Sequence, residues 1–225
     1  MKKPIMSVIL ASFVFALCAV SPGHGAEKEF SGFLNDYSQL GPGPKEGAKY
    51  RYVKPGVDFT KYKKVMLDGV VFFFAEDSKY KGIDPTELKD LSDQFNQAAA
   101  KALGDAYPLV AEAGPDVLRL RVAITKLESS SPGRSVISSV IPVGIAISVV
   151  KKAATGSWTG AGKTGMEMEA LDSLSNERIA AAVDERPGGK TSSFTKWGSA
   201  KEAFEFWAQR LRTVLDKVNG IEPKE

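Results

Sequence analysis

Carboxylate side chains in the last third of the chain have a type and spacing that could do chemistry. Glu167 and Glu169 alternate along one short segment, and Asp184 lies in the next segment after a turn. Two carboxylates at a suitable separation can hydrolyse a glycosidic bond, and carboxylate oxygens are also the ligands that calcium prefers. Glu167, Glu169 and Asp184 are therefore the candidate catalytic residues, and Asp172 and Glu185 could converge with them across a hairpin.

The same residues have a structural interpretation. Met166, Met168 and Ala170 alternate with the two glutamates, which places the glutamates on the opposite side of the predicted strand. Glutamates in this pattern are typical of a solvated face, and carboxylates serve catalysis only within a shaped cleft. We therefore expect a solvated face, no metal site and no cofactor.

The first 26 residues are typical of a secretory signal peptide. Lys2 and Lys3 precede an apolar stretch at residues 5–20, and small or helix-breaking residues follow it. We predict cleavage after Gly25 or Ala26. Export to the periplasm follows from this prediction, with association with the outer membrane as an open alternative.

Cleavage also limits the chemistry that the mature chain can perform. Cys18 and His24 are the only cysteine and the only histidine, and both lie in the predicted signal peptide. The mature chain would therefore lack a Cys–His nucleophile, a disulfide and the usual Cys/His zinc site. We do not expect lipidation at Cys18, because the bacterial lipoprotein motif favours a small residue where Leu17 stands.

Charge and motifs argue against nucleic acid and nucleotide as partners. Loss of Lys2 and Lys3 lowers the formal net charge from +3 to +1, which leaves no electrostatic footprint for nucleic acid. The sequence GAGKT at residues 160–164 resembles a phosphate-binding loop. Ser157, however, stands where the first glycine of that motif belongs, and a strand is predicted to follow in place of a helix.

About 200 residues remain after cleavage, enough for one domain with a sizeable core. We predict an extended N-terminal arm at residues 27–59, held against the domain by its aromatic side chains, and a single α+β domain at residues 60–220. Hydrophobic patterns predict a mixed sheet of about four strands with helices layered on one face. The strands are expected at residues 62–74, 116–127 (with one face in water), 165–171 and 177–186.

The two helices are predicted at residues 84–104 and 199–218. Each begins with a capping box, formed by Asp84 with Glu87 and by Ser199 with Glu202. The second helix has a buried stripe and a wet face. The buried stripe comprises Ala200, Phe204, Trp207, Leu211, Val214, Leu215 and Val218, and the wet face Lys201, Glu205, Arg212 and Asp216.

Residues 135–150 form a run of sixteen residues without a charge. The run is shorter than the ~20 residues of a membrane-spanning helix, and Pro142 and Gly144 interrupt it. We expect it to pack against the sheet as an insert, with peripheral membrane contact as the alternative. The candidate residues for contact with a partner or a membrane are Ile141, Val143, Ile145 and Ile147.

Several phrases of the sequence occur together in one bacterial family. They are residues 33–40, 62–68, 141–144 with 152–156, the hairpin at 167–186, and residues 204–211. In these phrases the chain resembles the envelope proteins of domain-of-unknown-function family 3313, many of which are lipoproteins. The resemblance covers nearly all of the mature chain and implies an envelope location. It carries no assigned activity, cofactor or site residue.

From these observations we expect a non-enzymatic binding or adaptor module of the cell envelope. Its partner would be an envelope protein or polymer. The alternative is a carboxylate-dependent hydrolase that acts on envelope polysaccharide and uses Glu167, Glu169 or Asp184.

Overall fold

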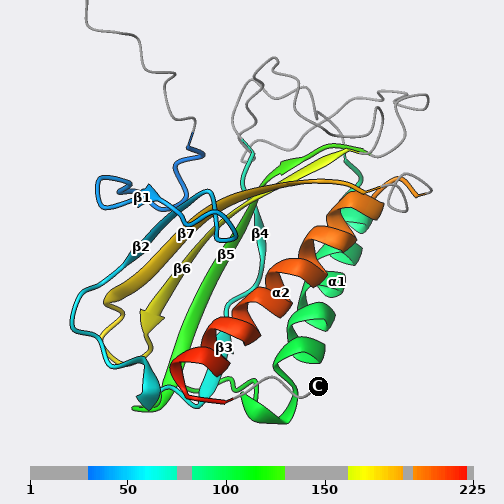
Figure 1. The fold of residues 1–225 in the computed structure, drawn as a ribbon. Helices are drawn as coiled ribbons and strands as arrows, with labels where there is room; N and C mark the ends of the chain where they lie inside the picture. Colours follow the sequence, from blue (N-terminus) through cyan, green and yellow to red (C-terminus); the bar gives the residue numbers. More distant parts are fainter. Residues whose placement is uncertain (1–29, 75–82, 130–161, 190–194, 222–225) are drawn as a thin grey trace, which may run out of the picture.

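A computed structural model describes residues 30–74, 83–129, 162–189 and 195–221. In these residues seven strands form one mixed sheet, and two long helices pack on one of its faces (Figure 1). The predicted α+β class, with helices on one face of a mixed sheet, is confirmed. The sheet is larger than the expected one of about four strands.

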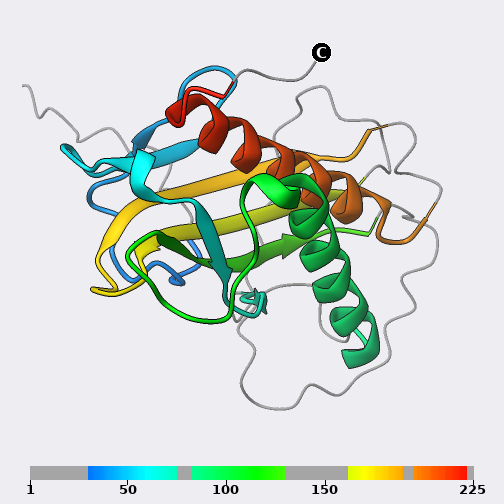
Figure 2. The same cartoon turned by 90° about the horizontal axis from the view of Figure 1, so that it is seen from below.

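Three long antiparallel strands form the middle of the sheet. They are β5 (Val117–Leu127), β6 (Lys163–Asp172) and β7 (Arg178–Pro187). The predicted hairpin between the last two is confirmed, and Asn176 takes the left-handed conformation expected for its turn, with φ of 56°. Figure 2 shows these strands side by side beneath the helices.

Shorter strands extend the sheet at both edges. β3 (Lys64–Leu67) and β4 (Val71–Phe72) both pair in parallel with β5, so the prediction of one continuous strand at residues 62–74 is wrong. The break begins at Asp68, whose carboxylate accepts hydrogen bonds from Arg119 at 3.0 and 2.8 Å. At the other edge, β2 (Tyr50–Val53) pairs with β7, and β1 (Gly41–Pro42) pairs with β2.

Helix α1 (Pro85–Leu103) begins and ends where its local signals predict. The Asp84 carboxylate accepts a hydrogen bond from the Thr86 amide at 2.7 Å. Gly104 ends the helix with φ of 52°, a conformation that costs glycine little. Glu87 does not complete the predicted capping box, because its carboxylate accepts hydrogen bonds from the Lys196 ammonium.

Helix α2 (Gly198–Val218) begins one residue earlier than predicted and without a capping box. The Ser199 hydroxyl donates to the Glu128 carbonyl at 3.2 Å, and Glu202 accepts from the Gly189 amide at 3.0 Å. Both side chains are therefore committed to the segments around the helix start and not to its first turn.

Two residues of α2 differ from their predicted burial. Val214 was expected in the buried stripe but is 53% exposed. Asp216 was expected on the wet face but is only 9% exposed, because Arg212 one turn earlier donates to both of its oxygens. The other predicted stripe residues that pack into the core are, as predicted, Ala200, Phe204, Trp207, Leu211 and Leu215.

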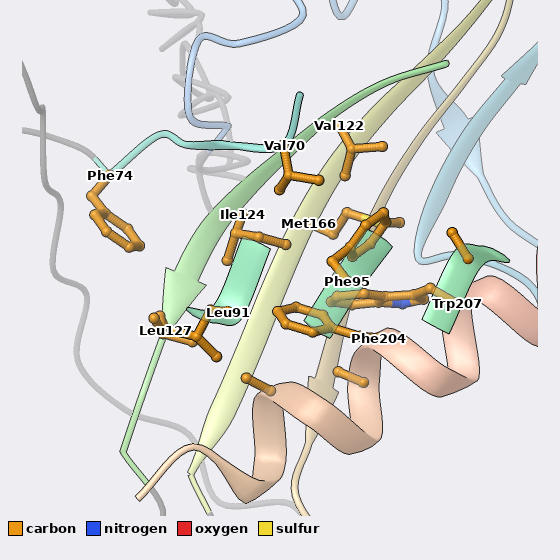
Figure 3. Close-up of a cluster of buried hydrophobic side chains, with 13 residues drawn as sticks. Val70, Phe74, Leu91, Phe95, Val122, Ile124, Leu127, Met166, Phe204 and Trp207 are labelled. Carbon is orange, nitrogen blue, oxygen red and sulfur yellow. The ribbon is translucent and has the colours of Figure 1, made fainter. Parts of the chain in front are cut away.

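The main core fills the space between the helices and the sheet. Figure 3 shows aromatic rings from both helices, Phe95 of α1 with Phe204 and Trp207 of α2, pointing toward Ile124 and Met166 on the strands. The Phe95 and Phe204 rings meet edge to face, with their centroids 5.4 Å apart. Burial of these large side chains is the main stabilising contribution of the helix layer.

The second face of the sheet is covered by residues 30–40. Phe33, Leu34 and Leu40 are buried against Ala123 and against side chains of β7. Of the expected extended arm at residues 27–59, residues 30–40 cover this face with their aromatic and aliphatic side chains, and the residues that follow supply β1 and β2. The expected solvated face is wrong, because residues 30–40 lie over it.

Several expected features lie outside the described residues. These are the signal peptide and the apolar run at residues 135–150, with Ile141, Val143, Ile145 and Ile147. Neither helix of the described ranges is both long enough and apolar enough to cross a membrane. The proposed domain boundaries stay a prediction.

Candidate functional site

Glu167 is buried beneath residues 30–40, and each of its carboxylate oxygens accepts a hydrogen bond there. It is 1% exposed. Its Oε1 accepts a hydrogen bond from the Ser31 amide at 2.7 Å, and its Oε2 accepts one from the Tyr37 hydroxyl at 2.6 Å. Burial together with this hydrogen bond raises the pKa of Tyr37 to about 12, so the hydroxyl remains a donor throughout the neutral range.

Glu169 lies two residues further along the same face and is 3% exposed. It forms ion pairs with Arg121 and with Arg178, whose Nε lies 2.7 Å from Oε2. Arg178 also donates to the backbone carbonyls of Leu34 and Asp36. The buried carboxylate thus orients a guanidinium that holds the N-terminal segment in place.

Asp184 lies on the opposite face of the sheet from the two glutamates. It pairs in register with Met166, beneath the helices. Its carboxylate accepts hydrogen bonds from Trp207 Nε1 at 2.9 Å, from Arg210 at 3.2 Å and from the Lys49 amide at 3.2 Å. The fold therefore does not bring the three candidate carboxylates together.

The two other acidic residues considered with them are also tied to local partners. Burial alone would raise the pKa of Glu185, but hydrogen bonds from Lys126 and Lys163 outweigh it and lower the pKa to about 2. Asp172 accepts from Lys61 and Tyr62 at the start of the turn. Within the described ranges, no cluster of three or more Asp, Glu, His or Cys side chains is arranged to hold a metal ion.

A cavity of about 220 Å³ lies between α2 and the strands β2, β7 and β6. It exists because the strand residues below α2 are small. Ala180 and Ala182 point to the helix side of β7, and both remain partly exposed there. Alanine side chains are too short to fill the space between a sheet and a helix, so the packing is incomplete.

The cavity opens to the surface between β2 and α2. Val53 of β2 is 50% exposed, and Val214 of α2 is 53% exposed. We call the opening and the cavity the apolar groove, defined by Val53, Ala180, Ala182, Leu211 and Val214. A mainly apolar cavity that opens to solvent is typical of a binding site for a small apolar ligand.

Two arginine side chains line the groove, one from β2 and one from α2. Arg51 pairs in register with Ala182 and is exposed. Arg210 reaches from α2 to Asp184 and to the Glu46 carbonyl. The combination of an aliphatic lining with a few convergent polar groups makes this groove the strongest candidate binding site among the described residues.

One feature of the sequence indicates this groove. Residues 180–182 are three consecutive alanines in a strand, where larger β-branched side chains are usual. A run of small side chains in a central strand indicates that something else must fill the layer. Only the fold shows that the side chains of α2 leave part of the space above these alanines unfilled.

A family model described as a protein of unknown function, DUF3313, matches residues 29–211. Proteins named "Uncharacterized lipoprotein YdcL" from two strains of Escherichia coli are each 27% identical to this chain over 183 residues. The aligned part covers 78% of this chain and 81% of each relative.

Solved structures show only a distant likeness. A PelC dodecamer from Paraburkholderia phytofirmans is 12% identical with a TM-score of 0.37, over 71% of this chain and 94% of that chain. A DUF4136 family protein from Bacteroides thetaiotaomicron is 10% identical with a TM-score of 0.37, over 74% of this chain and 95% of that chain. Likeness at this level assigns no function.

Proposed function

This chain belongs to the DUF3313 family of envelope lipoprotein-like proteins of unknown function, and from that premise we propose that it is a non-enzymatic binding module of the cell envelope. The site is the apolar groove between α2 and β7. The observation that carries the proposal is a cavity lined mainly by apolar side chains that opens to solvent beside Val53 and Val214.

The state of the carboxylates supports binding over hydrolysis. Both oxygens of Glu167 and of Glu169 are engaged by protein donors, and Asp184 accepts three hydrogen bonds on the other face. A general acid and its partner must instead face one cleft with room for the substrate. These carboxylates are placed to hold the fold together.

The volume of the cavity limits the size of the ligand that it can bind. Most small-molecule sites have volumes of roughly 300–1,000 Å³. The cavity here, at about 220 Å³, is below that range. Apolar cavities on the order of 150 Å³ stay dry and bind small apolar molecules. A single aliphatic chain fits this description better than a sugar polymer, which would need hydrogen-bonding partners along its length.

Methyl NMR spectroscopy of the mature chain, titrated with decanol, tests this proposal. We expect saturable shifts at the methyl groups of Ala180, Ala182 and Val214, and no shift at Val71, which is exposed on the distant strand β4. Decanol that gave no saturable shift, or that shifted Val71 equally, would overturn the proposal.

The location within the envelope is part of the same proposal. We place the domain in the periplasm. The relatives are named lipoproteins, which supports a lipid anchor, whereas Leu17 before Cys18 argues against one. Labelling of cells with a palmitate analogue, with Cys18→Ser as the control, decides between an anchored and a free form.

A further inference from the structure

Arg51 projects from β2 on the same side of the sheet as the groove. Its register partner is Ala182, which lies on the groove floor. The guanidinium is exposed, and among the described residues it has no acidic partner. A cation beside a mainly apolar cavity, with no ion pair of its own in the described part of the chain, is placed to meet a negative charge from outside the chain.

Arg210 adds a second, rigidly held guanidinium on the α2 side. One of its terminal nitrogens donates to Asp184 and the other to the Glu46 carbonyl. The guanidinium carbon lies 4.3 Å from the centre of the Phe206 ring, and that of Arg186 lies 3.5 Å from the same ring. Asp184 is the carboxylate that pairs with this group, so positive charge is in excess here.

We infer that the groove takes a single-chain amphiphile with an anionic headgroup, its aliphatic chain along Ala180, Ala182 and Val214 and its headgroup at Arg51. This inference rests on the proposed function and adds the charge of the ligand to it. The headgroup is a carboxylate or a phosphate, because both accept paired hydrogen bonds from a guanidinium.

Charge complementarity separates this ligand from its alternatives. A cationic amphiphile would be repelled by Arg51 and Arg210. A neutral chain would fill the cavity but would leave the exposed guanidinium without a partner. A two-chain lipid is too large for a cavity of about 220 Å³.

Calorimetric titration of the mature chain with four C12 compounds, each kept below its micelle concentration or solubility limit, tests the inference. The compounds are dodecanoate, dodecyl phosphate, dodecanol and dodecyltrimethylammonium. We expect at least one of the anions to bind roughly ten-fold more tightly than dodecanol, as a charge-assisted contact would give. The cation should bind more weakly than dodecanol.

Arg51→Gln is the informative variant, because an exposed side chain can be replaced without disturbing the core. It should lower the affinity for the anions to that for dodecanol and leave dodecanol binding unchanged. Lys101→Gln, at an exposed site on α1, is the matched control for loss of one positive charge.

The outcomes distinguish the anionic headgroup from the groove itself as a binding site. Equal affinity for anions and dodecanol, or anion binding unchanged in Arg51→Gln, would overturn the anionic headgroup and keep the groove. Absence of saturable binding by every compound would overturn the groove itself. A preference between dodecanoate and dodecyl phosphate identifies the headgroup.

Discussion

The hydroxyl of Tyr37 lies 2.6 Å from Oε2 of Glu167, 130 positions further along the chain. The same hydroxyl accepts hydrogen bonds from the amides of Gly32 and Leu34. One tyrosine therefore organises the turn of the N-terminal segment and satisfies a buried carboxylate on the sheet. Residues 30–40 are consequently a structural layer of the domain and not a peripheral tail.

Removal of that hydroxyl should destabilise the domain. Tyr37→Phe leaves one oxygen of buried Glu167 without its donor and two amides without their acceptor. The loss of a hydrogen bond to a buried charged group costs about 1–3 kcal/mol. Urea unfolding should show this decrease, with Tyr52→Phe, in the same aromatic cluster, within about 0.5 kcal/mol of the parent. Equal stability of the two variants would contradict the role given to Tyr37.

Arg178→Gln should loosen the N-terminal segment before the rest of the fold. The substitution removes the ion pair with Glu169 and two hydrogen bonds to the segment's carbonyls, while Arg121 still pairs with Glu169. Hydrogen exchange should quicken at residues 33–40 and stay slow in α1.

Lys54→Gln is the control for the loss of a charge near Arg178. Lys54 pairs with Glu177 at the exposed end of the hairpin, and exposed pairs contribute about 0–1 kcal/mol. Faster exchange spread evenly over the sheet and α1 in Arg178→Gln would show that Arg178 supports the whole fold and not the segment.

Glu185 makes stability depend on pH in the acid range. Its pKa falls from an ordinary 4.5 to about 2 in the folded chain. The contribution is therefore fully present above pH 4.5 and is lost as the pH falls toward 2. Allowing for solvent screening around the lysines, the loss should be about 1–2 kcal/mol.

Urea unfolding of the parent chain and of Glu185→Gln, at several pH values across this window, measures that contribution. The variant should lose less stability on acidification than the parent, because it has no carboxylate to protonate at this position. Identical slopes for the two proteins would mean that Lys126 and Lys163 do not stabilise the ionised form of Glu185.

The elements that could be predicted are those with local signals. Asp84 and Gly104 bound α1 through contacts within one turn, and the alternation around Asn176 predicts the hairpin. β1 and β2 could not be predicted in this way, because they lie in a region rich in glycine and proline. β2 pairs with β7, more than 120 positions away, and β1 pairs with β2.

The candidate site was harder to predict, because burial of charge depends on distant partners. Glu167 and Glu169 have the spacing of a solvated face, and their burial depends on partners far away in the sequence: Ser31 and Tyr37 for Glu167, and Arg121 and Arg178 for Glu169. Asp216 is also buried with a partner, but this partner is local, because Arg212 lies one turn earlier in α2. The groove is harder still, since it is defined by side chains that are too small to fill it.

The central claim is that the space beside Ala182 binds the ligand, and Ala182→Phe tests it most directly. The phenyl ring would fill the cavity, whereas Ala113→Phe adds the same ring at an exposed loop. Val214→Gln, at a half-exposed position, is a second variant that keeps the core intact.

Affinity for dodecanol, measured by calorimetry on folded protein of each variant, is the measurement. We predict at least a roughly ten-fold loss in Ala182→Phe, a smaller loss in Val214→Gln and no change in Ala113→Phe. Dodecanol binding that is as tight in Ala182→Phe and Val214→Gln as in the parent chain would contradict the account.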